Sequence, residues 1–275
     1  MTDETNSKTE KLIEVRDLTH SYRLGRNRYV KALDNVSFDI RRGEIFGLIG
    51  ESGSGKSTFA KCIMNMLKPD KGSVLYKGID IYDRKAYGDS RKMLQLKRQM
   101  IFQDSDTALD QRMTVGDIIA EPMLINHFKP KRGSLEAEVR FQMHYAGLDA
   151  DCFDRYPSEL SGGQRQRTAI ARAMTVEPEF IAADEPLSSL DASIQAQIIN
   201  LFRHLKEEHD LTLLLISHDL AVVRYLCDRT AVMHNGRIVE VNDTARLFEA
   251  PQDPYTRKLI EDIPDLTRRK DKNSV

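Results

Sequence analysis

Gly50-Glu51-Ser52-Gly53-Ser54-Gly55-Lys56-Ser57-Thr58 lies between the apolar run 45–49 and a second apolar stretch. Glycines at both ends let the backbone curl, so that successive N–H groups converge on an anion. Lys56 adds a mobile cation, and the Ser57 hydroxyl is a hard oxygen ligand for Mg²⁺. A helix that begins here would point its positive N-terminal end at the same phosphates. The stretch therefore predicts a site for a nucleoside triphosphate with Mg²⁺, to which every residue except Glu51 contributes; a merely flexible Gly/Ser loop is the alternative.

Composition bounds what kind of protein this is. The 275 residues can bury a large core, as one large α/β domain or as a core domain with an inserted helical lobe. The net charge is −1 although 30% of the residues are charged, so there is no overall basic field and we expect no nucleic-acid partner. Cys62, Cys152 and Cys227 are far apart, which excludes a CxxC metal site. We expect them to be small buried residues in a reducing cytosol.

The N-terminal residues carry no signal for export. The first ten residues are polar and acidic and lack the apolar region of a secretory signal. The most apolar run, 211–216, is far shorter than the about 20 residues needed to cross a bilayer. We therefore expect the protein to stay inside the cell and to meet a membrane only through partners. Residues 1–11 are expected to be a flexible N-terminus and 266–275 a disordered tail.

Hydrophobic periodicity predicts strands on both sides of a helical insertion. Alternation over 36–40 predicts a half-exposed strand in an early antiparallel region, and 44–49 a buried strand. Further short strands are expected within 72–81, as a pair, and at 97–102. The short apolar runs 180–183 and 212–216, separated by an amphipathic helix over 192–208, are typical of a parallel α/β core.

Between these strands the pattern is helical from Val115 to about Gly147. Ser134 is suited to cap the N-terminus of a helix, and Gly147 to end one. This region predicts an inserted helical lobe.

A second anion site is indicated by Leu160-Ser161-Gly162-Gly163-Gln164. Ser161 and Gln164 have capping-box spacing, so Ser161 should begin a helix whose first amides point outward. Capping explains the serine and the glutamine. It does not explain two glycines, which we expect to be exposed at the helix start.

With Leu160 to Gln164, the chain resembles the ATP-binding subunits of ABC transporters, whose signature is Leu-Ser-Gly-Gly-Gln. The resemblance implies an α/β fold: a P-loop ATPase core with an antiparallel β subdomain and an inserted α-helical subdomain. The nucleotide-binding domain would span 12–248, with its helical subdomain at about 104–172. In this family the signature of one subunit covers the nucleotide at the P-loop of the other. The resemblance thus implies a dimer in which Ser161, Gly162, Gly163 and Gln164 bind the partner's ATP.

The remaining family elements can be placed residue by residue. Asp184 and Glu185 end the apolar strand that begins at Phe180, at the edge where α/β sheets place their chemistry. By resemblance Asp184 holds Mg²⁺ and Glu185 is the general base. Gln103 matches the glutamine that reaches the metal or the water, and His218 the switch histidine at the γ-phosphate. The other six histidines are expected to be structural.

Two more positions follow from the same resemblance. Asp191, in the segment 188–191, matches the D-loop that crosses the dimer interface. Tyr22 matches the aromatic residue that stacks on adenine, with core packing as the alternative. The implied catalytic set is Glu185, His218, Gln103 and Lys56, and the implied metal ligands are Ser57, Gln103 and Asp184. Because all are present, we expect ATP hydrolysis.

Three stretches, 112–122, 191–200 and 250–256, are similar to the oligopeptide, dipeptide and nickel importers, and more to their F-type than their D-type subunit. Two features differ from the usual pattern: Asp253, where histidine is commoner, and the segment Asp104 to Asp110. A C-terminal extension is expected over 249–265. The implied partners are a second ATP-binding subunit, D-type or another copy of this chain, two permeases, and an external solute-binding protein. The chain would be peripheral on the cytoplasmic membrane face, and the permeases and binding protein would select the cargo.

Two rival classes fit the sequence less well. Soluble ABC-type ATPases that act on DNA, ribosomes or cluster assembly usually have coiled-coil arms, zinc-binding cysteines or tandem ATPase domains, which this sequence lacks. A P-loop kinase has no use for the signature.

Overall fold

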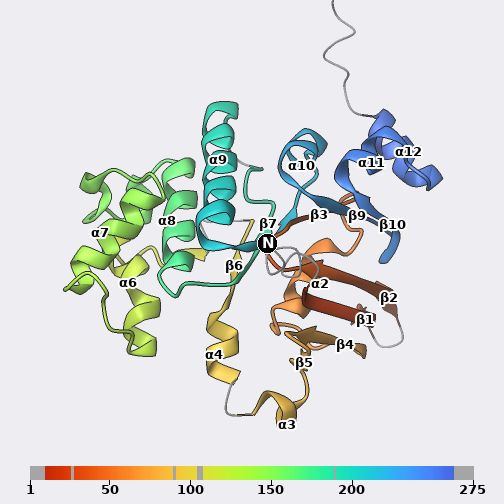
Figure 1. Ribbon diagram of the computed structural model, residues 1–275, viewed down its shortest axis with the longest axis horizontal. Coiled ribbons are helices and arrows are strands. Elements are labelled where there is room, and N and C mark those ends of the chain that lie inside the picture. Colours follow the sequence, from red (N-terminus) through yellow and green to blue (C-terminus); the bar gives the residue numbers. More distant parts are fainter. Residues whose placement is uncertain (1–9, 26–27, 89–90, 104–107, 189, 263–275) are drawn as a thin grey trace, which may run out of the picture.

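The computed structural model describes residues 10–25, 28–88, 91–103, 108–188 and 190–262 (Figure 1). Residues 1–9 of the expected flexible N-terminus (1–11), the whole of the expected tail (266–275) and residues 104–107 of the atypical segment lie outside the described residues. Among the described residues, no helix is both long and apolar enough to span a lipid bilayer.

A six-stranded sheet is the centre of the molecule, with the strand order β10-β9-β3-β8-β7-β6. The five strands from β9 to β6 run parallel, and β10 pairs antiparallel with β9. The bounds are β3 Ile45–Ile49, β6 Arg98–Ile101, β7 Phe180–Asp184, β8 Thr212–Ile216, β9 Arg229–His234 and β10 Arg237–Asp243. The expected strands at 44–49, 97–102, 180–183 and 212–216 are confirmed. Strands β9 and β10 lie outside those that the sequence pattern predicts.

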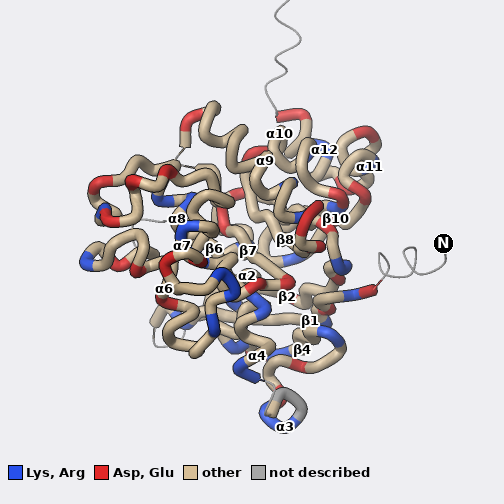
Figure 2. The backbone as a smooth tube through the Cα atoms, turned by 60° about the vertical axis from the view of Figure 1, so that its left-hand side comes forward, with Lys and Arg blue, Asp and Glu red and all other residues tan. Residues whose placement is uncertain are grey.

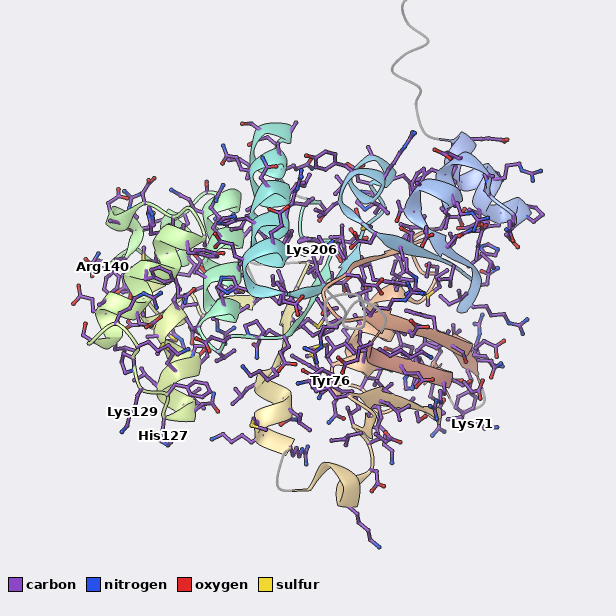
Figure 3. All side chains as sticks on the ribbon, in the orientation of Figure 1. Lys71, Tyr76, His127, Lys129, Arg140 and Lys206 are labelled. Carbon is purple, nitrogen blue, oxygen red and sulfur yellow. The ribbon has the colours of Figure 1, made fainter. Side chains whose placement is uncertain are left out.

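A second, antiparallel sheet has the order β2-β1-β4-β5. Its strands are β1 Lys11–Arg23, β2 Tyr29–Arg41, β4 Lys71–Tyr76 and β5 Ile79–Asp80, which confirms the early antiparallel region and the strand pair within 72–81. Tyr76 of β4 is fully buried, and its hydroxyl donates to Glu179 Oε2 at 3.3 Å, just before β7 (Figure 3). This hydrogen bond joins the two sheets close to the start of β7.

The helices gather in groups around these sheets (Figure 1). Helices α6, α7 and α8 form a lobe beside β6 and β7, while α11 and α12 lie at the β10 edge. Their bounds are α2 Lys56–Ile63, α3 Arg84–Tyr87, α4 Arg91–Leu96, α6 Val115–Asn126, α7 Leu135–Tyr145, α8 Gly162–Met174, α9 Ala192–His209, α10 Leu220–Leu226, α11 Thr244–Glu249 and α12 Pro254–Glu261, with 3₁₀ turns at Ala150–Cys152 and Pro157–Glu159.

The helical pattern predicted from Val115 to about Gly147 is confirmed as two helices, α6 and α7. Helix α6 ends at His127, whose φ is 56°, and α7 begins at Ser134, whose side chain accepts from Ala137 N–H. Gly147 follows α7 with φ 72°, a conformation that suits glycine. The N-cap and the stop therefore lie where the sequence predicts them.

The central sheet divides two hydrophobic cores because side chains alternate along each strand. On β3, Ile45 and Ile49 face the core shared with helices α6 to α10, while Phe46 and Leu48 face the core shared with α2 and the antiparallel sheet. Strands β7 and β8 alternate in the same way. Cys62, Cys152 and Cys227 are all buried, as expected. Acidic and basic residues are interspersed over the elements (Figure 2).

Candidate nucleotide site

The glycine-rich loop joins β3 to α2 and is shaped by close backbone packing. Gly50 has φ 149° and Gly55 has φ 112°, values that side-chain-bearing residues rarely adopt. A Cβ at Gly50 would collide with the carbonyl oxygen of Met233, and a Cβ at Gly55 with that of Ala32. Ser54 is buried, while Ser52 and Gly53 are exposed at the tip. The loop can therefore keep this path only with glycine at its two ends.

Lys56 lies under the loop and is 6% exposed. Its Nζ donates to the carbonyl oxygens of Gly50 at 2.7 Å and Glu51 at 2.8 Å, and lies 3.4 Å from Ser54 Oγ. Burial lowers the pKa of the Lys56 ammonium, while the nearby carboxylates of Glu185 and Asp184 act in the opposite direction. The loop's own carbonyls thus hold a desolvated cation beside the predicted phosphate site.

Ser57 and Asp184 meet although 127 residues separate them, because α2 begins beside the end of β7. The Ser57 hydroxyl donates to Asp184 Oδ1 at 3.2 Å. Burial is the main cause that raises the pKa of Asp184; the Ser57 hydrogen bond lowers it, and Glu185 raises it. Hydroxyl and carboxylate oxygens are the ligands that Mg²⁺ prefers. Among the described residues there is no group of three or more His, Cys, Asp or Glu that could hold a metal ion.

Gln103, Glu185 and His218 converge at the ends of three adjacent parallel strands, β6, β7 and β8. Gln103 Nε2 donates to Glu185 Oε2 at 3.2 Å, and His218 Nδ1 lies 3.2 Å from the same oxygen. Glu185 adopts a φ of 47°, and its N–H donates to the Ile216 carbonyl at 2.9 Å. The Glu185 side chain is 19% exposed and that of His218 is 63% exposed. One carboxylate oxygen is therefore held by two polar groups at a face that solvent can reach.

Tyr22, on β1 of the antiparallel sheet, lies beside the start of α2. Its hydroxyl lies 3.4 Å from Thr58 Oγ1, in the first turn of α2. Tyr22 is 39% exposed as a residue, and its ring packs edge-on against His20, with ring centroids 4.8 Å apart. An aromatic face is thus available beside the glycine-rich loop.

The segment Ser161 to Gln164 has the predicted capping box. Ser161 N–H donates to Gln164 Oε1 at 2.9 Å, and Gln164 N–H donates to Ser161 Oγ at 3.3 Å. The expectation of two exposed glycines is wrong, because Gly163 is buried and Gly162 is half-buried. A Cβ at Gly163 would lie 2.6 Å from Ile194 Cγ2 of α9. The second glycine therefore allows α8 and α9 to pack closely.

Asp191 begins α9. Its Oδ1 accepts from the N–H groups of Ser193 and Ile194, both at 3.0 Å. Just before it, Ser188 Oγ donates to the carbonyl oxygen of Glu185 at 3.1 Å, and Ser189 lies outside the described residues. The expected D-loop thus follows closely after the strand end that carries Glu185.

The turn between β9 and β10 and the helix α12 also contact the glycine-rich loop. Sequence patterns do not reveal these contacts. Gly236 N–H donates to the Ser54 carbonyl at 2.9 Å, and Tyr255 of α12 accepts from Glu51 N–H at 3.3 Å. The only sequence signal for Tyr255 is its place in the similar stretch 250–256. Pairing across 204 residues is a property of the fold.

Comparisons with known proteins point to the same family as the sequence motifs do. The family model described as ABC transporter matches residues 33–188, and the one described as oligopeptide/dipeptide transporter, C-terminal region, matches 239–275. The chain is 46% identical over 256 residues to the oligopeptide transport ATP-binding protein OppF of Streptococcus mutans, covering 93% of this chain and 82% of that protein. It is 44% identical to the putative oligopeptide transport ATP-binding protein YkfD of Bacillus subtilis, covering 92% and 76%.

Two solved structures share the fold. One is a dimeric post-hydrolysis state of the ATP-binding cassette MJ0796 bound to ADP and Pi, with a TM-score of 0.75 and 28% identity over 84% of this chain and 98% of that one. The other is cbiO1 from Clostridium perfringens, part of the ABC transporter complex cbiONQ, with a TM-score of 0.75 and 27% identity over 93% and 96%.

Proposed function

We propose a function from the premise that this chain belongs to the ABC transporter family, among the ATP-binding subunits of oligopeptide and dipeptide transporters. The chain hydrolyses ATP and thereby powers the import of oligopeptides or dipeptides, or of a related cargo such as a nickel chelate, through partner permeases. Relatives that the alignment with this chain covers to 82% and 83% of their length carry the name oligopeptide transport ATP-binding protein. Cargo selection belongs to the permeases and the solute-binding protein.

One observation carries the ATPase assignment: Gln103 and His218 approach the same oxygen of Glu185, beside the loop that holds Lys56. A base for hydrolysis needs an oriented carboxylate next to the phosphate site. Adjacent strand ends supply that orientation here, since β6, β7 and β8 are hydrogen-bonded neighbours. A solvated turn would leave the three side chains apart.

The proposed roles of the residues are supported by this geometry and by the family resemblance. The loop amides from Gly50 to Thr58, except that of Glu51, bind the triphosphate, and Lys56 exchanges its carbonyl partners for phosphate oxygens. Glu185 takes the proton of the attacking water, which His218 and Gln103 hold in place. Ser57, Asp184 and Gln103 would hold Mg²⁺, which supplies charge neutralisation at the phosphates when bound. Tyr22 stacks on adenine.

The second half of the site comes from a partner subunit. Ser161, Gly162, Gly163 and Gln164 cover the nucleotide bound to the opposite loop, and Asp191 belongs to the segment that crosses the interface. A D-type subunit is the favoured partner, and a second copy of this chain is the alternative. The pair sits peripherally on the cytoplasmic membrane face against two permeases, which a solute-binding protein supplies with cargo. The domain limits are 12–248 for the nucleotide-binding domain, about 104–172 for its helical subdomain and 249–265 for the extension.

The test is affinity purification of the tagged full chain from gently solubilised membranes of its own cell, with mass spectrometry of co-purifying proteins. The tag alone is the control. Recovery of two multi-span permeases and a second P-loop subunit supports the proposal, and the accompanying binding protein then indicates the cargo. Recovery of soluble partners alone overturns the transport role while leaving ATP hydrolysis intact.

A further inference from the structure

The C-terminal helix α12 is anchored to β10 through one buried carboxylate. Glu240 is 8% exposed, and its Oε1 and Oε2 accept from Gln252 N–H at 3.1 and 3.2 Å. Oε2 also accepts from Asp253 N–H at 3.0 Å. Asp253 in turn caps α12, because its Oδ1 accepts from Tyr255 N–H at 2.8 Å. The backbone that carries Tyr255 is therefore fixed at its start, independently of the nucleotide site.

From this anchor the Tyr255 side chain reaches the glycine-rich loop. Its hydroxyl accepts from Glu51 N–H at 3.3 Å, and its ring packs on His234, with centroids 3.8 Å apart and ring planes at 32°. Burial raises the pKa of the Tyr255 hydroxyl. His234 ends β9, next to Met233, whose carbonyl oxygen abuts Gly50. The Tyr255 hydroxyl thus contacts Glu51 directly, and the Tyr255 ring packs on the neighbour of the residue that abuts Gly50.

Glu51 is held at both of its backbone polar groups. Its N–H donates to Tyr255, and its carbonyl oxygen accepts from Lys56 at 2.8 Å and from Ser54 N–H at 3.2 Å. The Lys56 contact is one that phosphate binding replaces, because the ammonium is needed at the phosphate oxygens. The Tyr255 contact does not involve Lys56 and can persist through that exchange. It then holds the first peptide of the loop when Lys56 leaves.

We propose that Tyr255 is a positioning residue of the phosphate-binding loop, through which the C-terminal extension preorganises that loop for the triphosphate. It acts through the Glu51 amide rather than on the reacting atoms. Fixing the loop in advance reduces the conformational entropy that nucleotide binding must remove. The effect on ATP rests on the proposed function, whereas the effect on the loop does not.

The test compares Tyr255→Phe, which removes only the hydroxyl, with Tyr225→Phe. Tyr225 is 63% exposed on α10, and its hydroxyl lies 3.4 Å from an Arg203 nitrogen, so it is a matched control outside the site. Amide hydrogen exchange of the full chain is measured without nucleotide for the peptides 45–56 and 251–262. Loss of one neutral hydrogen bond should speed exchange in the loop peptide of Y255F about threefold to tenfold. Exchange in 251–262 and the melting temperature should stay as in the wild type.

Steady-state kinetics then separate positioning from catalysis. For Y255F we expect KM for ATP to rise about threefold to tenfold, with kcat within about twofold of the wild type. Glu240→Ala, which frees the anchor, should speed exchange in both peptides. Unchanged loop exchange in Y255F overturns the inference, as does an equal rise in both peptides, which marks a structural role. If the chain lacks ATPase activity but Y255F loosens the loop, the proposed function fails and the positioning role stands.

Discussion

Two regions of the molecule are built from polar side chains: the cluster at the strand ends and the start of α8. The cluster consists of Ser57, Gln103, Asp184, Glu185 and His218. The two regions differ in how far along the chain their hydrogen-bond partners lie. In the cluster, Ser57 bonds Asp184, and Gln103 and His218 approach Glu185, across separations of 33 to 127 residues. At α8, Ser161 and Gln164 satisfy each other across three residues. The cluster is therefore a product of tertiary structure, whereas the α8 start is a local motif.

This difference says what each region can do alone. The cluster already holds a desolvated cation, an oriented carboxylate and a hydroxyl within one chain. The α8 start presents a capped helix end, and its capping bonds reach only its own first turn. A helix N-terminus of this kind attracts an anion, and that anion has to be bound by another region. We interpret the pair of regions as two halves of a site that closes between subunits.

The largest expected effect is in the cluster. Glu185→Gln should lower the ATP turnover at least about 100-fold, because an amide cannot accept the water's proton. ATP binding should persist, and a closed dimer should accumulate on size-exclusion chromatography with ATP. Glu207→Gln is the control, since Glu207 pairs with Arg203 on the exposed face of α9. Turnover unchanged in E185Q would remove Glu185 as the general base.

A covalently linked pair of copies can test whether the α8 start serves the loop of the opposite chain. Two substitutions are placed either both on one chain or one on each chain. Lys56→Ala disables a loop, and Ser161→Arg disables an α8 start. If α8 serves the opposite loop, both substitutions on one chain damage both sites, while one on each chain leaves one site intact. We expect about half of the wild-type turnover for the second arrangement and about tenfold less for the first, from a stopped ATPase assay.

Lys71→Ala replaces K56A as the control in that experiment, because Lys71 is exposed at the start of β4 (Figure 3). The reverse ranking of the two arrangements would mean that α8 serves the loop of its own chain.

The smallest expected effect is on stability. Because burial raises the folded-state pKa of Asp184, its contribution to stability is present below the unfolded value of about 3.8 and is lost as pH rises through the folded value. Asp184→Asn should therefore raise the melting temperature at neutral pH by about 1–4 °C while abolishing turnover, with little gain near pH 4. Thermal unfolding without nucleotide or Mg²⁺ checks this. Asp110→Asn should give no gain, since Arg112 lowers the pKa of that exposed carboxyl to about 2; a fall in the D184N melting temperature at neutral pH would contradict the sign.

Much of the fold follows from local patterns. The buried strands, the antiparallel region, the cap at Ser134 and the capping box at Ser161 were each predicted and confirmed, because each depends on residues within one element. Strands β9 and β10 were not predicted. The expected exposure of Gly163 is wrong, because Ile194, on another helix, packs against it. The roles assigned to the site residues stay predictions.

The sequence by itself determined the glycine-rich loop, its lysine and hydroxyl, the carboxylate pair and the start of α8, because those features lie within a few consecutive residues. Only the tertiary structure decided which of them meet. Strand order brings Gln103 and His218 to one oxygen of Glu185, and the β9–β10 turn and α12 bring Met233 and Tyr255 to the loop. The physical reason is that hydrogen bonds and packing act over a few ångströms in space, regardless of the number of residues between the partners.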